Sequence, residues 1–197
     1  LLGNDLATFP DFPAEIRAPQ GTIAGVSGFQ VHIGNTEINT PGDIADVLVA
    51  MNPAALKANE NWIKKGGTII VNTDSFATRE IEKAGYENSP LEDGSFESYN
   101  VIQAPITSLT REALKDSGLD GKSIGRSKNM FALGIVYWMF SRPMEQTENF
   151  LKKKFAKKPD LVEANIKVLH TGYNFAETIE ALPTSYTVLK ADIEKGI

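Results

Sequence analysis

Three short segments with the pattern of strands constrain the fold of this chain most strongly, and the first of them is almost entirely apolar. They span residues 46–51, 68–71 and 99–104, and more polar segments with helical patterns separate them. Strands that are apolar along their whole length are typical of a parallel sheet buried on both faces, and crossovers between parallel strands are right-handed. The pattern therefore predicts a doubly wound, mostly parallel α/β sheet.

Capping residues predict where the helices between these strands begin and end. Asn52 and Pro53 suit the N-cap and the first position of a helix over residues 54–64. Gly66 and Gly67 are expected to stop that helix. The other helices expected in this region cover residues 78–84 and 110–117.

The sequence after residue 126 predicts a helical C-terminal portion. Ser127 suits the N-cap of a helix over residues 128–140, which is apolar nearly all round and is therefore expected to be buried. Pro143 and Pro159 each suit the start of a further helix. Residues 183–197 are interpreted as a linker.

The N-terminal region has β character. A short strand is expected over residues 6–9, and a longer β region over residues 22–33. In the second half of that region Phe29, Val31 and Ile33 alternate with polar residues. Strict alternation places the apolar side chains on one face of a strand.

Composition excludes several classes of function. The 197 residues contain no cysteine and only two histidines, so disulfides and cysteine-held iron–sulfur clusters are excluded and no metal centre is expected. The net charge of −5 argues against sequence-independent nucleic-acid binding. No apolar run reaches the roughly 18 residues of a membrane-spanning helix. We therefore expect a soluble, cytoplasmic domain that binds neither nucleic acid nor membrane.

Polar side chains follow two of the predicted strands. Asn52 comes after the first strand, and Asn72, Thr73 and Asp74 come after the second. In open α/β sheets, ligands bind beyond the carboxyl ends of the strands, where helix N-termini present free N–H groups to anions. We therefore expect these residues to line a ligand crevice. Ordinary helix capping is the alternative for each of them.

A loop ahead of the long β region supplies further candidates. Arg17 suits bidentate contact with a phosphate or a carboxylate, and Gln20 and Gly21 would shape that loop. A local ion pair between Glu15 and Arg17 is the alternative. Asn129, near the expected start of the buried helix, would donate to a neighbouring molecule or cap the turn.

Two basic motifs invite interpretation as phosphate sites. Gly121, Lys122 and Ser123 match the end of a phosphate loop, but the required first glycine falls at Asp116 and a helix precedes the motif. A surface turn is the preferred interpretation. The lysines between residues 152 and 158 could touch the phosphates of a ligand, although a solvated helix end is favoured.

Several of these segments, in this order, resemble a known family. The segments resemble the γ-type region of 2-oxoacid:ferredoxin oxidoreductases. They look most like the form that is fused to the front of the α subunit in 2-oxoglutarate:ferredoxin oxidoreductase. The resemblance covers residues 8–182, and its specificity lies in the ordered set of segments. Those segments are residues 9–22, 25–33, 46–52, 66–72 and 128–134.

The resemblance implies a Rossmann-like domain of an enzyme that oxidatively decarboxylates a 2-oxoacid and releases acyl-CoA. CoA enters as a substrate and is associated with the γ-type domain, together with subunit packing. Thiamine diphosphate, Mg and an iron–sulfur cluster are expected in the rest of the complex, on thiamine-binding α and β subunits or domains. Electrons would leave through ferredoxin. The candidates Arg17, Gln20, Gly21, Asn52, Asn72, Thr73, Asp74 and Asn129 would then bind CoA or form an interface, and none is catalytic.

The resemblance also sets expected boundaries. Residues 1–182 would form the γ-type domain without its first βα unit, and residues 183–197 would lead towards a thiamine-binding domain. The chain alone is expected to be inactive. Two alternatives stay open: a structural docking domain without a ligand, and a nucleotide-binding oxidoreductase domain, which needs a glycine turn that these residues lack.

Overall fold

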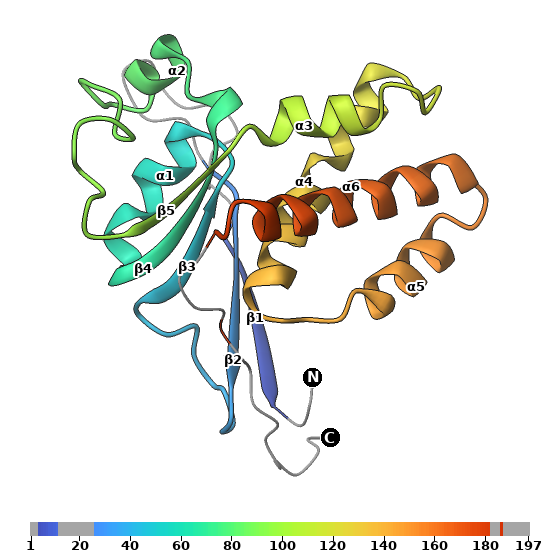
Figure 1. The fold of residues 1–197 in the computed structure, drawn as a ribbon. Coiled ribbons are helices and arrows are strands. Elements are labelled where there is room, and N and C mark those ends of the chain that lie inside the picture. The colour runs from blue at the N-terminus through green and yellow to red at the C-terminus, as the bar shows by residue number, and fades with distance from the viewer. Residues whose placement is uncertain (1–3, 12–25, 182–185, 187–197) are drawn as a thin grey trace. The chain divides into compact units, whose positions relative to one another are not determined.

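A computed structural model describes residues 4–11, 26–181 and 186 of the chain. The chain divides into two compact units (Figure 1). Of the described residues, the first unit holds 4–11, 26–71 and 75–102, and the second holds 72–74, 103–181 and 186. Each unit is described by itself below.

The first unit contains an antiparallel pair of strands. β1 (Asp5–Asp11) pairs with β2 (Gly28–Gly34) in continuous register, from Asp5 opposite Gly34 to Asp11 opposite Gly28. The predicted alternation in β2 is confirmed, but its apolar side is the exposed one. Phe29 is 66% exposed, Val31 49% and Ile33 42%.

The sheet predicted from the apolar segments is confirmed. Its strands lie in the order β3 (Ala45–Ala50), β4 (Ile63–Asn72) and β5 (Asn100–Ala104). β3 and β4 run parallel, with Leu48 opposite Ile69 and Ala50 opposite Val71. The α/β class with a parallel sheet is therefore the one that the sequence predicts, consistent with a Rossmann-like fold.

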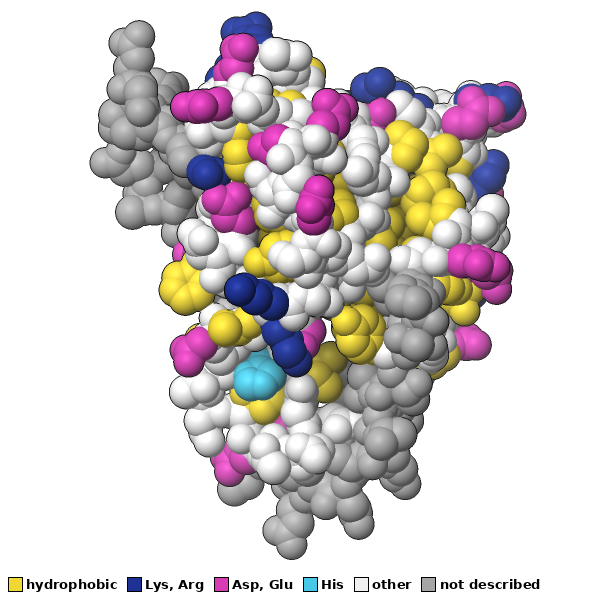
Figure 2. All heavy atoms as spheres, turned by 60° about the vertical axis from the view of Figure 1, so that its left-hand side comes forward, with side chains coloured by type: hydrophobic (Ala, Val, Ile, Leu, Met, Phe, Trp, Pro, Cys, Tyr) yellow, Lys and Arg dark blue, Asp and Glu magenta, His cyan; other side chains and the backbone are white. Residues whose placement is uncertain are grey.

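Helices α1 (Pro53–Asn59) and α2 (Thr78–Lys83) belong to the same unit as β3 and residues 63–71 of β4. A cluster of buried apolar side chains links α1 to the strands. Burial of such side chains is the main source of stability in a domain. The cluster comprises Ala50, Leu56, Ile63, Ile69, Val71 and Phe96. Elsewhere hydrophobic side chains reach the surface among charged ones, as the face in Figure 2 shows.

The predicted helix over residues 54–64 is wrong in its second half. The α-helix ends at Asn59, a 3₁₀ turn covers Glu60–Trp62, and β4 already begins at Ile63. Gly66 and Gly67 therefore lie inside a strand and do not stop a helix. A Cβ atom on Gly67 would lie 2.9 Å from the Asp46 carbonyl oxygen, so the glycine permits close approach where the β3–β4 register shifts.

The second unit is largely helical, as predicted. Its helices are α3 (Ile106–Ala113), α4 (Gly121–Met139), α5 (Glu145–Lys154) and α6 (Pro159–Thr178). Three predicted starts are wrong: α3 begins four residues before Thr110, α4 begins at Gly121, and α5 begins two residues after Pro143. The Asp120 carboxylate caps α4 by accepting from the Lys122 and Ser123 N–H groups, at 2.9 and 3.0 Å. The expected surface turn at residues 121–123 is thus the first helical turn.

Helices α4 and α6 form the core of the second unit. The prediction that residues 128–140 are buried is confirmed for the α4 face that carries Phe131 and Ile135, both fully buried. Gly134 of α4 and Gly172 of α6 lie at the closest approach of the two helices. A Cβ atom on Gly134 would lie 2.7 Å from the Tyr173 nitrogen, and one on Gly172 would lie 2.7 Å from the Phe131 carbonyl carbon.

Candidate functional site

The first candidate residues come directly after β4. Asn72 is fully buried, and its side chain meets the first turn of α3. Its Nδ2 donates to the Thr107 hydroxyl at 3.0 Å, and its Oδ1 accepts from the Thr107 N–H at 3.3 Å. The amide therefore satisfies a backbone donor that the start of a helix leaves without an intrahelical partner.

The Asp74 carboxylate also accepts hydrogen bonds from the first turn of α3. One carboxylate oxygen accepts from the Ser108 N–H at 2.6 Å, and the other accepts from the Ser108 hydroxyl at 2.8 Å. Pro105, at the N-cap of α3, offers no side-chain cap. A carboxylate at a helix N-terminus is also favoured by the helix dipole. Asn72 and Asp74 together hold the start of α3.

Helix capping, the alternative interpretation, is thus observed at three strand-end positions. Asn72 and Asp74 act on α3, a helix more than thirty residues further along the chain. Asn52 caps α1, since its Oδ1 accepts from the Ala55 N–H at 2.8 Å. Helix capping by itself explains why Asn and Asp side chains occupy these three positions. Whether the same residues bind a ligand stays a prediction.

The other candidates fall in different places. Thr73 is half-buried in the 3₁₀ turn after β4. Asn129 is exposed in the middle of α4, so the expected position near a helix start is wrong. The loop residues Arg17, Gln20 and Gly21 lie outside the described residues.

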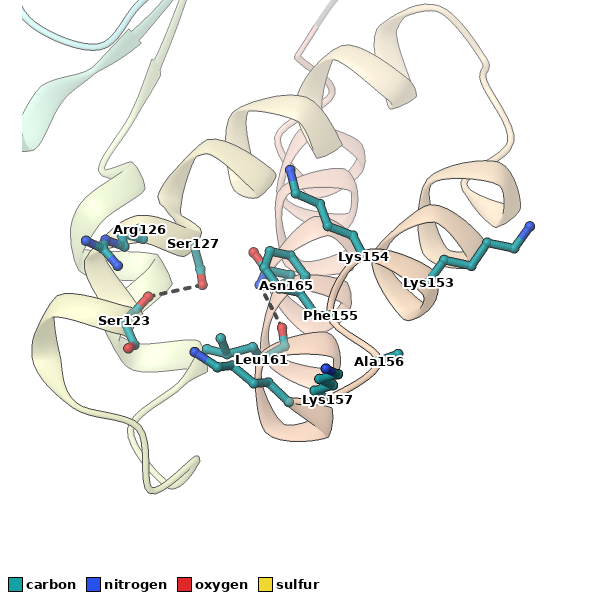
Figure 3. A pocket seen from close by; sticks show the side chains of 11 residues that line it. Ser123, Arg126, Ser127, Lys153, Lys154, Phe155, Ala156, Lys157, Leu161 and Asn165 are labelled. Carbon is teal, nitrogen blue, oxygen red and sulfur yellow. Dashed lines mark hydrogen bonds between the residues drawn. The ribbon is translucent and has the colours of Figure 1, made fainter.

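A cavity of about 510 Å³ lies in the second unit, between α4 and the segment from the end of α5 into α6 (Figure 3). The sequence pointed to its lysines but favoured a solvated helix end. It gave no indication of Arg126 and Ser127 on the opposite wall, because only the packing of α4 against α6 brings them there. The lining residues are Ser123, Arg126, Ser127, Lys153, Lys154, Phe155, Ala156, Lys157, Lys158, Leu161 and Asn165.

The most perturbed titratable group of the described residues is structural. Burial, followed by the neighbouring Glu60 carboxylate, raises the pKa of Tyr86 far above its usual 10.0. The Tyr86 hydroxyl donates to Glu60 at 2.6 Å, and Lys57 contacts both the second Glu60 oxygen and the Tyr86 ring. The cluster fastens the end of α1 to the segment after α2 and offers no acid or base near neutral pH.

Neither a metal centre nor a membrane span is found in the described part of the chain. No group of three or more His, Asp or Glu side chains is placed to hold a metal ion there. No helix among these residues is long and apolar enough to cross a bilayer.

Comparison with known proteins gives consistent matches. The family model described as pyruvate ferredoxin/flavodoxin oxidoreductase matches residues 1–175. The 2-oxoglutarate oxidoreductase subunit KorA of Mycobacterium tuberculosis (strain ATCC 25618 / H37Rv) is 50% identical over 196 residues, which cover 100% of this chain and 30% of that protein. The chain therefore spans less than a third of that relative's length.

Two solved structures share the fold. The 2-oxoglutarate:ferredoxin oxidoreductase of Magnetococcus marinus, with 2-oxoglutarate, coenzyme A and succinyl-CoA bound, matches with a TM-score of 0.67 and 23% identity, over 97% of this chain and 29% of that one. The γ subunit of a keto/oxoacid ferredoxin oxidoreductase from Geobacter sulfurreducens PCA matches with a TM-score of 0.56 and 19% identity, over 89% and 82% of the two chains.

Proposed function

Because this chain belongs to the pyruvate ferredoxin/flavodoxin oxidoreductase family, we propose that it is the γ-type domain of a 2-oxoacid:ferredoxin oxidoreductase that uses 2-oxoglutarate. The observation that carries the proposal is the 50% identity to a 2-oxoglutarate oxidoreductase subunit along the whole chain. The domain contributes CoA binding and subunit packing to the oxidative decarboxylation of the 2-oxoacid to acyl-CoA. It works in the cytoplasm.

The chemistry of the complex then belongs mainly to its other parts. Thiamine-binding α and β subunits or domains hold thiamine diphosphate and Mg, which supply the decarboxylation. The sequence contains no cysteine, so the ligands of an iron–sulfur cluster come from elsewhere in the complex. Ferredoxin accepts the electrons. This chain by itself is inactive.

Two features of the fold support the assigned tasks. The exposed apolar face of β2, made by Phe29, Val31 and Ile33, suits a surface that another part of the complex covers. The polar residues after β3 and β4 follow the carboxyl ends of parallel strands, the usual position of ligands in α/β sheets. We assign CoA contacts to Arg17 and Asn52, with Gln20 and Gly21 shaping the loop around Arg17, and keep Thr73 as a candidate interface residue.

A calorimetric titration of CoA tests this assignment, with NAD as the control ligand. It is carried out on the chain alone and on its complex with the thiamine-binding subunits. We expect the complex to bind CoA and not NAD. Absence of CoA binding in a complex that still assembles would leave a structural docking role. Binding of NAD would instead favour a nucleotide-binding oxidoreductase domain.

Three variants locate the contact. Arg17→Gln should weaken CoA binding about tenfold or more, the effect of losing a charge-assisted hydrogen bond. Arg79→Gln removes the same charge from the exposed surface of α2 and should leave the affinity unchanged. Asn52→Ser keeps a good helix cap but removes the amide, so weaker CoA binding by this variant separates ligand contact from capping. Unchanged CoA affinity in Arg17→Gln and Asn52→Ser would remove both residues from the site.

A further inference from the structure

The cavity in the second unit carries a concentration of positive charge that the proposed function does not use. Five of its eleven lining residues are cationic, and none is acidic, in a chain whose net charge is −5. They come from both walls, with Arg126 on α4 and the lysines on and after α5 (Figure 3). The cations are Arg126, Lys153, Lys154, Lys157 and Lys158.

These charges are not neutralised within the described part of the chain. Four other lysines there form ion pairs with carboxylates at 3.6 Å or less, but none of the five cavity cations does. The Lys154 ammonium lies 5.3 Å from the centre of the Phe150 ring and 5.7 Å from the centre of the Phe155 ring. Like charges held close together repel each other, and an anion between them relieves that repulsion.

The neutral polar side chains on the walls are engaged within the protein, so charge is what the cavity offers an anion. The buried Ser127 hydroxyl donates to the Ser123 carbonyl at 3.4 Å, and Asn165 Nδ2 donates to the Leu161 carbonyl at 2.6 Å (Figure 3). Ser123 is engaged, since its hydroxyl donates to the Asp120 carboxylate at 2.7 Å. The start of α6 adds to the positive potential, because no side chain of the described residues caps it and its N-cap residue Lys158 lines the cavity.

We propose that this cavity binds the phosphate groups of a small phosphorylated ligand, with Arg126 and Lys157 supplying charge from opposite walls. The volume of about 510 Å³ falls within the range of small-molecule pockets, about 300–1,000 Å³. A guanidinium binds two phosphate oxygens at once, and lysines add point charges around it. A compact anion fits a half-open hollow of this volume better than an extended acidic peptide does. The inference rests on the cavity and not on the strand-end residues assigned to CoA.

Titration calorimetry with inorganic pyrophosphate tests the proposal on the chain in its native assembly. The double variant Arg126→Gln/Lys157→Gln should weaken pyrophosphate binding at least tenfold. The control Lys152→Gln/Lys167→Gln removes the same charge from exposed positions on α5 and α6 that do not line the cavity, and should change the affinity less than twofold. Circular dichroism confirms that both variants remain folded.

Each outcome decides the matter. No pyrophosphate binding by the unmodified protein overturns the proposal, as does an equal loss of affinity in the cavity and control variants, which indicates a general charge effect. Tighter binding of a polyglutamate peptide than of pyrophosphate would show a protein-binding surface instead. Titrations with ADP and CoA then distinguish the source of the phosphates. Loss of CoA binding in Arg17→Gln with retained pyrophosphate binding would leave this cavity independent of the CoA site.

Discussion

The contact between α4 and α6 predicts opposite effects of the same substitution at two positions of one helix. Gly134 faces the backbone of α6, where a new Cβ atom would meet the Leu169 carbonyl oxygen and lie 2.7 Å from the Tyr173 nitrogen. Gly125 lies on the same helix, and a Cβ atom there would meet no atom of the described residues within 4 Å. Gly134→Ala and Gly125→Ala therefore add the same methyl group to a closed and an open environment.

The magnitudes follow from two opposing terms. Replacing glycine by alanine inside a helix stabilises it by about 1 kcal/mol. At Gly134 the atoms in the way belong to the backbone of a neighbouring helix, so α4 and α6 must separate by several tenths of an ångström or more. Overpacking of this kind costs about 3 kcal/mol at the upper end of its usual range. The net expectation is a loss of about 2 kcal/mol for Gly134→Ala and a gain of about 1 kcal/mol for Gly125→Ala.

Thermal unfolding followed by circular dichroism measures both effects. In a protein of this size 1 kcal/mol shifts Tm by about 2–4 °C. We expect Gly134→Ala to lower Tm by about 4–8 °C and Gly125→Ala to raise it by about 2–4 °C. A Tm for Gly134→Ala equal to or above that of the unmodified chain would refute the close approach of the two helices.

Three further changes test other features. Thr110→Val should raise the free energy of unfolding by about 1 kcal/mol in urea titrations, because the buried Thr110 hydroxyl has no hydrogen-bond partner among the described residues; a decrease would show that the hydroxyl is satisfied. Tyr86→Phe should cost about 1–2 kcal/mol near neutral pH by removing the hydrogen bond to Glu60. The pKa of Tyr86 is raised on folding, so its contribution is complete below pH 10.0 and is lost as the pH rises above that value; equal stability losses at pH 8 and pH 11 would contradict this. Asp120→Ala should lower Tm at neutral pH. Bonds from Ser123 lower the pKa of Asp120, so the difference should vanish as the pH falls below its usual 3.8, and a difference that persists in acid would point to a cause other than charge.

The parts of the fold that depend on local patterns were predictable from the sequence. Strand β3 stands out because it is nearly all apolar, and β4 because Ile69, Ile70 and Val71 follow one another, as a sheet covered on both faces requires. The start of α6 follows from Pro159, which occupies its first turn. The start of α4 was also within reach, since Asp120 is a good N-cap residue, but Gly121 and Gly125 weaken the helical pattern after it.

Features that depend on distant partners were not predictable in this way. The start of α3 was missed because its caps, Asn72 and Asp74, come from another part of the chain. The same applies to the basic cavity, where Arg126 stands opposite lysines that lie some thirty residues further along the chain. The exposure of the apolar face of β2 is likewise invisible in its alternating pattern, which fixes the two faces of a strand but not their surroundings.

The short segment Asn72–Asp74 has a consequence for any attempt to take the chain apart. It belongs to the second unit, although Val71 and Ser75 on either side of it belong to the first. A gene fragment that encodes residues 103–188 alone would produce α3 without the side chains that receive the Thr107 and Ser108 N–H groups. The second unit is therefore not encoded by one contiguous stretch of sequence. Moving residues 103–188 alone into another protein would omit the Asn72–Asp74 segment that belongs to the unit.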